Sequence, residues 1–174
     1  MIGRRGFLAG MAGVAVAAGP LAALAGGGER RLVLYNTHTG EALARAYWAG
    51  GEYDPAALAA FDRLLRDHRS GEIHPIDRGV LDILAALQAT LGFAGAWQVI
   101  SGYRSPKSNA MLASRGGGVS TRSLHMAGKA IDVRVPGRTV AQVGRAAIAL
   151  AAGGVGHYPA SDFTHLDVGR VRSW

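Results

Sequence analysis

One stretch, residues 123–132, constrains this chain more than any other feature of its sequence. It reads Ser-Leu-His-Met-Ala-Gly-Lys-Ala-Ile-Asp, and a later stretch, residues 162–167, reads Asp-Phe-Thr-His-Leu-Asp. Together they offer two imidazoles and several carboxylates in a chain that contains no cysteine. Nitrogen and oxygen donors of this kind suit a catalytic zinc ion with three protein ligands and one open position. We therefore predict that His125, Asp132 and His165 bind Zn²⁺.

The local patterns around these donors predict two strands. Apolar and polar residues alternate over 130–135, which is typical of a strand and directs Asp132 away from its apolar neighbours. The first histidine precedes this strand in a loop interrupted by glycine. Residues 164–168 predict a further strand, and His165 and Asp167 share a face of it because side chains alternate along a strand.

The composition limits the classes of protein to consider. A chain of 174 residues, 49% of them hydrophobic, is long enough for one domain with a sizeable core. The absence of cysteine excludes disulfides and thiolate metal sites. The net charge of +7 is spread along the chain without a nucleic-acid-binding motif, so no nucleic-acid partner is expected. In an exported protein this charge would favour an anionic wall polymer, although a solvated basic surface explains it equally well.

The first 25 residues have the pattern of an export signal. Arg4-Arg5 precedes an uncharged run over 6–24, and Ala23-Leu24-Ala25 offers a cleavage site between small residues. Gly3-Arg4-Arg5-Gly6-Phe7-Leu8 resembles the twin-arginine signal, with Gly3 where that pattern has Ser or Thr. We expect a signal peptide over 1–25, a domain over 26–174 in the periplasm, and no stable membrane insertion after cleavage. An uncleaved membrane anchor is the alternative.

The remaining segments predict a mixture of helices and strands. Alternating residues over 31–37 and 41–48 flank a tight turn, so we expect a hairpin there. Asp54-Pro55 is typical of a helix start, and a second apolar stripe restarts at Pro75 and ends at Gly92. Further along we expect a strand at 97–100, a short helix at 108–114, a helix from Thr139 through Ala152 and a strand at 155–158. A glycine-rich loop over 115–122 is a candidate wall of a cleft.

These elements predict an α+β domain. We expect a mainly antiparallel sheet that carries the metal site on one face, with the helices from Pro55 and Pro75 packed on the other. His38 is expected in the hairpin turn, and His68 and His74 at helix ends, where solvation or capping explains a histidine better than ligation. His157 is a competing ligand, because its strand is expected to lie beside the site.

Several motifs in combination resemble a known family. The pattern Ser-x-His-x-x-Gly-x-Ala-x-Asp over 123–132, followed by a strand and a later histidine, is similar to the zinc D,D-peptidase family (peptidase M15-like) that includes the Hedgehog-type domains. The segments at 102–105, 154–159 and 163–167, together with Trp174, resemble its branch of exported bacterial murein endopeptidases, formerly a domain of unknown function. The resemblance covers most of the chain from about Leu32.

The resemblance implies roles for individual residues. It places the zinc ligands at His125, Asp132 and His165, and the substrate contacts at Ser123 and Arg104. For the general base it implies the carboxylate three residues before the last zinc histidine, here Asp162. Asp167 remains open as the base or as a partner of a ligand.

The implied activity is zinc-dependent hydrolysis of amide bonds in the cross-link peptides of peptidoglycan. Zinc would polarise the scissile carbonyl and present a water molecule. The carboxylate of Asp162 or Asp167 would take the proton from this water and return it to the leaving amine, and Arg104 would stabilise the developing negative charge. The alternatives are a zinc D,D-carboxypeptidase and a non-catalytic wall-binding module of the same fold. Peptidoglycan peptides are the expected partner, and a monomer is expected.

Overall fold

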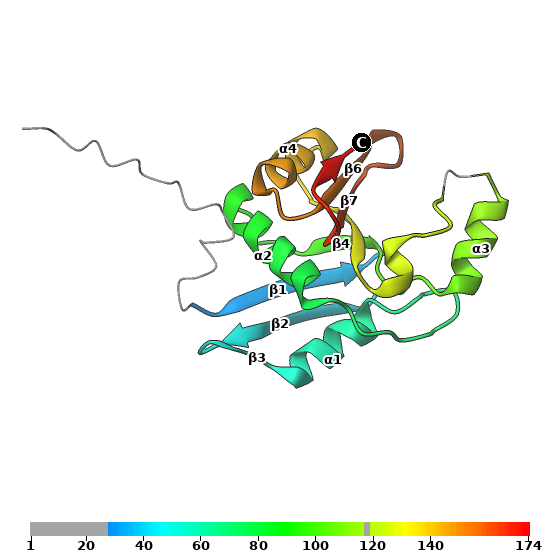
Figure 1. The fold of residues 1–174 in the computed structure, drawn as a ribbon. Helices are drawn as coiled ribbons and strands as arrows, with labels where there is room; N and C mark the ends of the chain where they lie inside the picture. Colours follow the sequence, from blue (N-terminus) through cyan, green and yellow to red (C-terminus); the bar gives the residue numbers. More distant parts are fainter. Residues whose placement is uncertain (1–27, 117–118) are drawn as a thin grey trace, which may run out of the picture.

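The computed structural model describes residues 28–116 and 119–174, which form a mixed α+β fold (Figure 1). The predicted signal peptide lies outside the described residues, as do residues 117 and 118 of the predicted glycine-rich loop. Within the described residues, no helix has the length and apolar character needed to cross a membrane.

The strands form one eight-stranded sheet in the described part of the chain, in the order β3-β2-β1-β4-β5-β7-β6-β8. Neighbouring strands are antiparallel except for the pairs β1–β4 and β6–β8, so the mainly antiparallel sheet is confirmed. The strands are β1 Arg30–Asn36, β2 Ala42–Ala49, β3 Glu52–Tyr53, β4 Trp97–Ser101, β5 Ala130–Arg134, β6 Gly154–Tyr158, β7 Phe163–Asp167 and β8 Arg172–Ser173.

The α-helices begin at capping side chains, whereas the 3-10 helices have none. The bounds are α1 Pro55–Leu64, α2 Arg78–Leu91, α3 Pro106–Ser114 and α4 Val140–Leu150, with short 3-10 helices at η2 Leu124–Ala127 and η3 Pro159–Ser161. The prediction that the second helix starts at Pro75 is wrong. Asp77 is its N-cap and accepts a hydrogen bond from the Gly79 amide at 2.9 Å. This bond satisfies one of the free amides of the first turn and so fixes the start.

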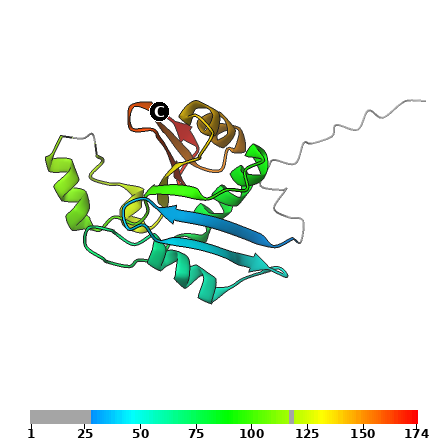
Figure 2. The same ribbon diagram turned by 180° about the vertical axis from the view of Figure 1, so that it is seen from behind.

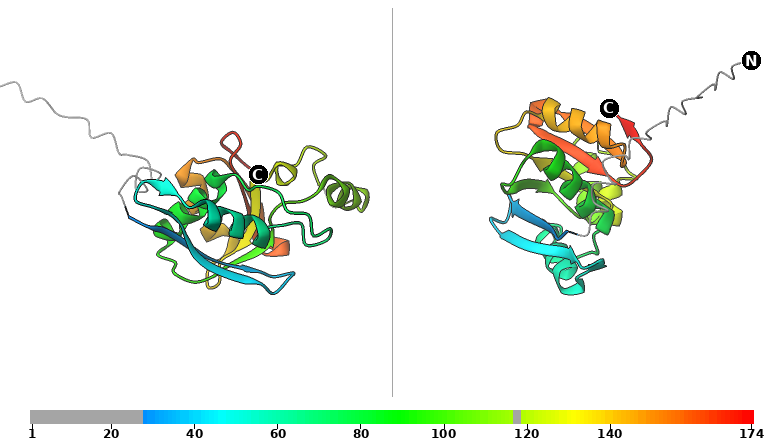
Figure 3. Two further views of the ribbon diagram at one scale, coloured as in Figure 1. Left: turned by 90° about the horizontal axis from the view of Figure 1, so that it is seen from below. Right: turned by 90° about the vertical axis from the view of Figure 1, so that its left-hand side faces the viewer.

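One face of the sheet packs against α1, α2 and α4. The residues on this face are buried and belong to one core: Leu32, Leu34, Trp97, Val99, Ile131, Val133, Val155 and Leu166. In Figure 1, α2 lies in front of β1. Figure 2, seen from behind, shows β1 and β2 from the face of the sheet that α2 does not cover. Figure 3 shows α3 extending away from the sheet. The expected helix layer is therefore present, although α3 is not part of it.

The register of β5 and β7 places polar residues on the opposite face. Ile131 pairs with Leu166 and Asp132 pairs with His165. Because side chains alternate along each strand, the first pair enters the core while the second projects from the other face. This pairing brings polar side chains from two separate sequence motifs together in one cluster.

His38 and His68 stack on each other at the hairpin turn, with ring centroids 3.9 Å apart. Burial, helped by the positive charge of Arg69, lowers the pKa of His68 to about 4. In the unfolded chain a histidine takes up its proton near pH 6.5. Between these values the unfolded state therefore binds more protons than the folded state, and stability rises with pH.

We expect the free energy of unfolding to fall as the pH is lowered from 7 towards 4, and to fall less in His68→Gln than in the wild type. Urea unfolding of both proteins at pH 7 and pH 5 measures the difference. An equal loss in the two proteins would show that His68 does not carry this dependence.

Candidate metal centre

Three donor atoms from separate elements converge on one point. His125 Nε2 lies 3.2 Å from His165 Nδ1 and 3.3 Å from Asp132 Oδ1, and His165 Nδ1 lies 2.8 Å from Asp132 Oδ1. A tetrahedral zinc ion with bonds of about 2.0–2.1 Å holds its donors about 3.3–3.4 Å apart. The triangle of donors therefore has nearly the size that a zinc ion requires, and it could hold one after small movements.

The backbone around His125 orients its ring. Its Nδ1 lies 2.7 Å from the carbonyl oxygen of Gly102, a group that can only accept a hydrogen bond. Nδ1 therefore carries the hydrogen, which leaves the lone pair on Nε2 facing the other two donors. Gly102 fits here because a side chain at this position would collide with the backbone of Leu65.

Asp167 orients the ring of His165. Its Oδ2 lies 3.1 Å from His165 Nε2, on the opposite side of the ring from the donor nitrogen Nδ1. Arg172 binds the same carboxylate through two nitrogens at 2.7 and 3.0 Å, and the amides of Gly154 and Gly169 donate to it at 3.2 and 2.8 Å. Asp167 is fully buried and its oxygens are occupied.

The charges in the cluster shift the pKa values of its members in opposite directions. Burial acts against the charged form of Asp132, but His125 and His165 outweigh it and hold the pKa of this carboxyl well below its usual range. Burial likewise acts to lower the pKa of His165, and its hydrogen bonds to Asp132 and Asp167 raise it to about 9. Without a metal, the cluster therefore keeps a proton on His165, which a divalent cation would displace. Metal affinity should accordingly fall as the pH falls.

Arg104 lies beside the cluster on the loop that follows β4. Its Nη2 is 3.8 Å from Asp132 Oδ2, and its nitrogens reach the side chains of Asn109 and Ser101 at 3.4 Å. Burial lowers the pKa of the guanidinium, and the charge of Asp132 opposes this. An arginine keeps its charge at neutral pH after such a shift. The site therefore contains a fixed cation next to the donor triangle.

The other residues predicted for the site differ in whether they line the pocket. Ser123 lines the pocket at the start of η2, where its side chain makes no capping hydrogen bond. Asp162 follows η3 and its carboxylate, 60% exposed, pairs with Arg134 Nε at 2.6 Å. Asp162 is not among the pocket-lining residues, although its neighbours Ser161 and Phe163 are.

His157 lies away from the three donors. It pairs with Thr164 on β7, so it shares the core face of the sheet rather than the face of His165. Its ring packs against Gly144 of α4, where an added side chain would overlap it. The three-donor group found in the described residues does not include it.

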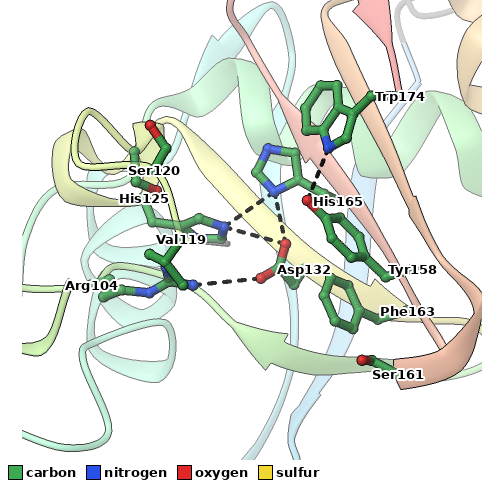
Figure 4. Close-up of a pocket in the computed structure, with 11 residues that line it drawn as sticks. Arg104, Val119, Ser120, His125, Asp132, Tyr158, Ser161, Phe163, His165 and Trp174 are labelled. Carbon is green, nitrogen blue, oxygen red and sulfur yellow. Dashed lines mark hydrogen bonds and ion pairs between the residues drawn. The ribbon is translucent and has the colours of Figure 1, made fainter. Parts of the chain in front are cut away.

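The pocket above the donors has two unlike sides. Figure 4 shows Arg104, Val119 and Ser120 on one side, Tyr158, Phe163 and Trp174 on the other, and the three donors between them. Sequence reasoning assigned no role to the aromatic residues or to Arg172. Tyr158 and Trp174 occur in the motifs that carry the family resemblance, which was the available signal for them.

We expect Asp167→Asn to weaken zinc binding by roughly 10- to 100-fold, the usual cost of removing the partner of a ligating histidine. The amide cannot balance the charge of Arg172, so the protein should also become less stable. Competition with a chromogenic zinc chelator measures the affinity. Asp162→Asn is the control, and it should bind zinc like the wild type. Equal affinities in all three proteins would mean that Asp167 does not support the metal.

Comparison with known proteins gives similarities over most of the chain. A family model described as peptidoglycan L,D-endopeptidase MepK matches residues 25–174. The peptidoglycan L,D-endopeptidase MepK of Escherichia coli (strain K12) is 41% identical over 145 residues, which are 83% of this chain and 80% of that protein. The probable peptidoglycan L,D-endopeptidase MepK of Haemophilus influenzae is 40% identical over 146 residues, or 83% and 78% of the two chains.

Proposed function

Since the chain belongs to the peptidoglycan L,D-endopeptidase MepK family, of peptidase M15 type, we propose that it is a zinc-dependent murein endopeptidase. It would hydrolyse amide bonds in the cross-link peptides of peptidoglycan. The observation that supports this most strongly is the convergence of His125, Asp132 and His165 at the base of a pocket.

The donor set fits zinc in chemistry as well as in size. His125, Asp132 and His165 would hold the ion through two imidazole nitrogens and one carboxylate oxygen, a set of three protein ligands that is usual for catalytic zinc. When bound, zinc supplies polarisation of the scissile carbonyl and activation of a water molecule. Gly102 and Asp167 hold the two imidazoles with their donor nitrogens turned inward.

Arg104 and Ser123 would bind the substrate. The guanidinium of Arg104 is partly buried beside Asp132, where a charge is screened less than in water. It would stabilise the negative charge that develops on the carbonyl oxygen. The Ser123 hydroxyl, on the pocket wall, would donate to a backbone carbonyl of the peptide.

Asp162 is our candidate for the general base, the group that transfers the proton from water to the leaving amine. Asp167 is fully buried and its oxygens are bound, so it suits orientation of His165 rather than proton transfer. Asp162 is exposed, and the residues on either side of it line the pocket. Its carboxylate would have to leave Arg134 to reach the substrate, a rotation that its exposed position permits.

We place the enzyme in the periplasm, exported by the twin-arginine route and freed from its signal after residue 25. This follows from the sequence pattern of residues 1–25 and from a substrate that lies outside the cytoplasm.

Digestion of defined muropeptides tests the proposed function. The mature protein with zinc should split a 3-3 linked dimer, which contains an L,D bond, faster than a 4-3 linked dimer, which contains a D,D bond. Product masses identify the bond that is cut. Release of terminal residues from uncross-linked peptides alone would indicate a carboxypeptidase. Binding without any cleavage would indicate a non-catalytic wall-binding module.

A further inference from the structure

Three aromatic rings form one continuous side of the pocket. The rings of Tyr158 and Phe163 stack with centroids 4.6 Å apart. Trp174 Nε1 donates to the hydroxyl of Tyr158 at 2.9 Å, which joins the indole to this stack (Figure 4). Tyr158 is 37% exposed and Trp174 is 49% exposed. The rings are thus fixed to one another while apolar surface remains open to the pocket.

The backbone positions this aromatic side directly beside the metal ligands. β8 lies parallel to β6, and Trp174 continues it by donating to the Val155 carbonyl at 3.1 Å and accepting from the His157 amide at 2.9 Å. Gly156 lies beneath the rings and pairs with His165 on the next strand. A side chain at Gly156 would collide with the rings of Trp174 and Tyr158.

Arg172 connects the aromatic side to the metal centre. Its guanidinium lies 4.7 Å from the ring centroid of Trp174, and it also binds Asp167. The indole centroid is 5.4 Å from that of His165. Trp174 is therefore held from two sides at a fixed position next to a donor histidine.

The two sides of the pocket would select different parts of a substrate. The opposite side carries Arg104, the one arginine or lysine among the described residues that line the pocket. Fixed, half-exposed aromatic rings offer apolar area at little cost in conformational entropy when they bind carbon chains. Aliphatic carbons would therefore lie against Trp174 and Tyr158, with polar or anionic groups towards Arg104.

We propose that Trp174 and Tyr158 are specificity-determining residues that bind the aliphatic carbons of the peptide residue adjoining the scissile amide. The proposal rests on the proposed function and identifies the part of the site that positions the cross-link. It assigns Trp174 to substrate contact and leaves metal binding to the three donors.

The test compares Trp174→Ala, Trp174→Phe and the wild type on a 3-3 linked muropeptide dimer. We expect Trp174→Ala to raise KM roughly tenfold, since losing an apolar contact of this size weakens binding by about that factor. The value of kcat should differ from that of the wild type by no more than about twofold, because the contact stabilises the bound substrate and the transition state equally. Trp174→Phe should recover most of the loss, and zinc content should be unchanged in both variants.

The matched control is Tyr35→Ala, which removes an aromatic ring that is 38% exposed on β1, outside the pocket. Its KM should equal that of the wild type. An unchanged KM in Trp174→Ala would overturn the proposal. A raised KM accompanied by loss of zinc would also overturn it, because Trp174 would then act through His165.

A binding measurement separates this proposal from the proposed function. Calorimetric titration of the zinc-loaded proteins with the same dimer is carried out if the wild type cleaves no cross-link. Weaker binding by Trp174→Ala than by wild type would then support the aromatic contact although the endopeptidase assignment had failed. Equal binding, or no binding to either protein, would overturn the contact as well.

Discussion

His125→Ala should lose its zinc and its hydrolysis of cross-linked muropeptides together. The substitution leaves two protein donors, Asp132 and His165, where three converge in the wild type. Removal of a group that merely orients a ligand costs roughly 10- to 100-fold in metal affinity, so removal of the ligand itself should cost more. Metal analysis after gel filtration, together with the muropeptide assay, measures both quantities. Thermal unfolding should also occur at a lower temperature than in the zinc-loaded wild type.

His157→Ala is the matched control for this experiment. His157 is the rival histidine on β6, and it lies on the core face of the sheet. The control should keep one zinc ion per chain and most of the activity. Loss of zinc from His157→Ala, with retention of zinc in His125→Ala, would show that His157 rather than His125 is a metal ligand. That result would contradict the predicted donor set.

Asp162→Asn should lower activity by roughly 10²- to 10⁴-fold while zinc binding stays intact, which is the usual size of a general-base contribution. Asparagine is the sharper substitution because Asp162 has a positive φ of 51°, a conformation that asparagine adopts more readily than alanine. The measurement is kcat/KM on the 3-3 linked dimer with zinc content determined on the same sample.

A second variant decides the outcome if Asp162→Asn remains active. Asp167→Asn, assayed with zinc in excess so that the metal site stays filled, would then reveal proton transfer by the other carboxylate as a loss of kcat. Full activity in both variants would place the proton path outside these two residues and contradict the proposed mechanism.

The local patterns of the sequence predicted much of the fold. Alternation over 130–135 predicted β5, and the pair Asp54-Pro55 predicted α1, because strand periodicity and helix capping act over a few residues. The start of α2 was misplaced because the prediction rested on Pro75, whereas the hydrogen bond from the Gly79 amide makes Asp77 the N-cap.

Contacts between distant segments were harder to predict. Arg172 binds Asp167, and Trp174 lies over Gly156, only because the two-residue strand β8 pairs with β6. So short a strand has no periodicity that a sequence can reveal. The same limit applies to Asp162 and Asp167, since the sequence gives their spacing from His165 but neither their burial nor their partners.

Removal and return of the metal tests the central claim most directly. The mature protein is stripped with a chelator, its zinc content is measured, and its hydrolysis of the 3-3 linked dimer is followed as zinc is added back. The account predicts no cleavage by the metal-free protein and full recovery at one zinc ion per chain, with no recovery in His125→Ala at the same zinc concentration. Full hydrolysis by a protein that contains no measurable metal would contradict it.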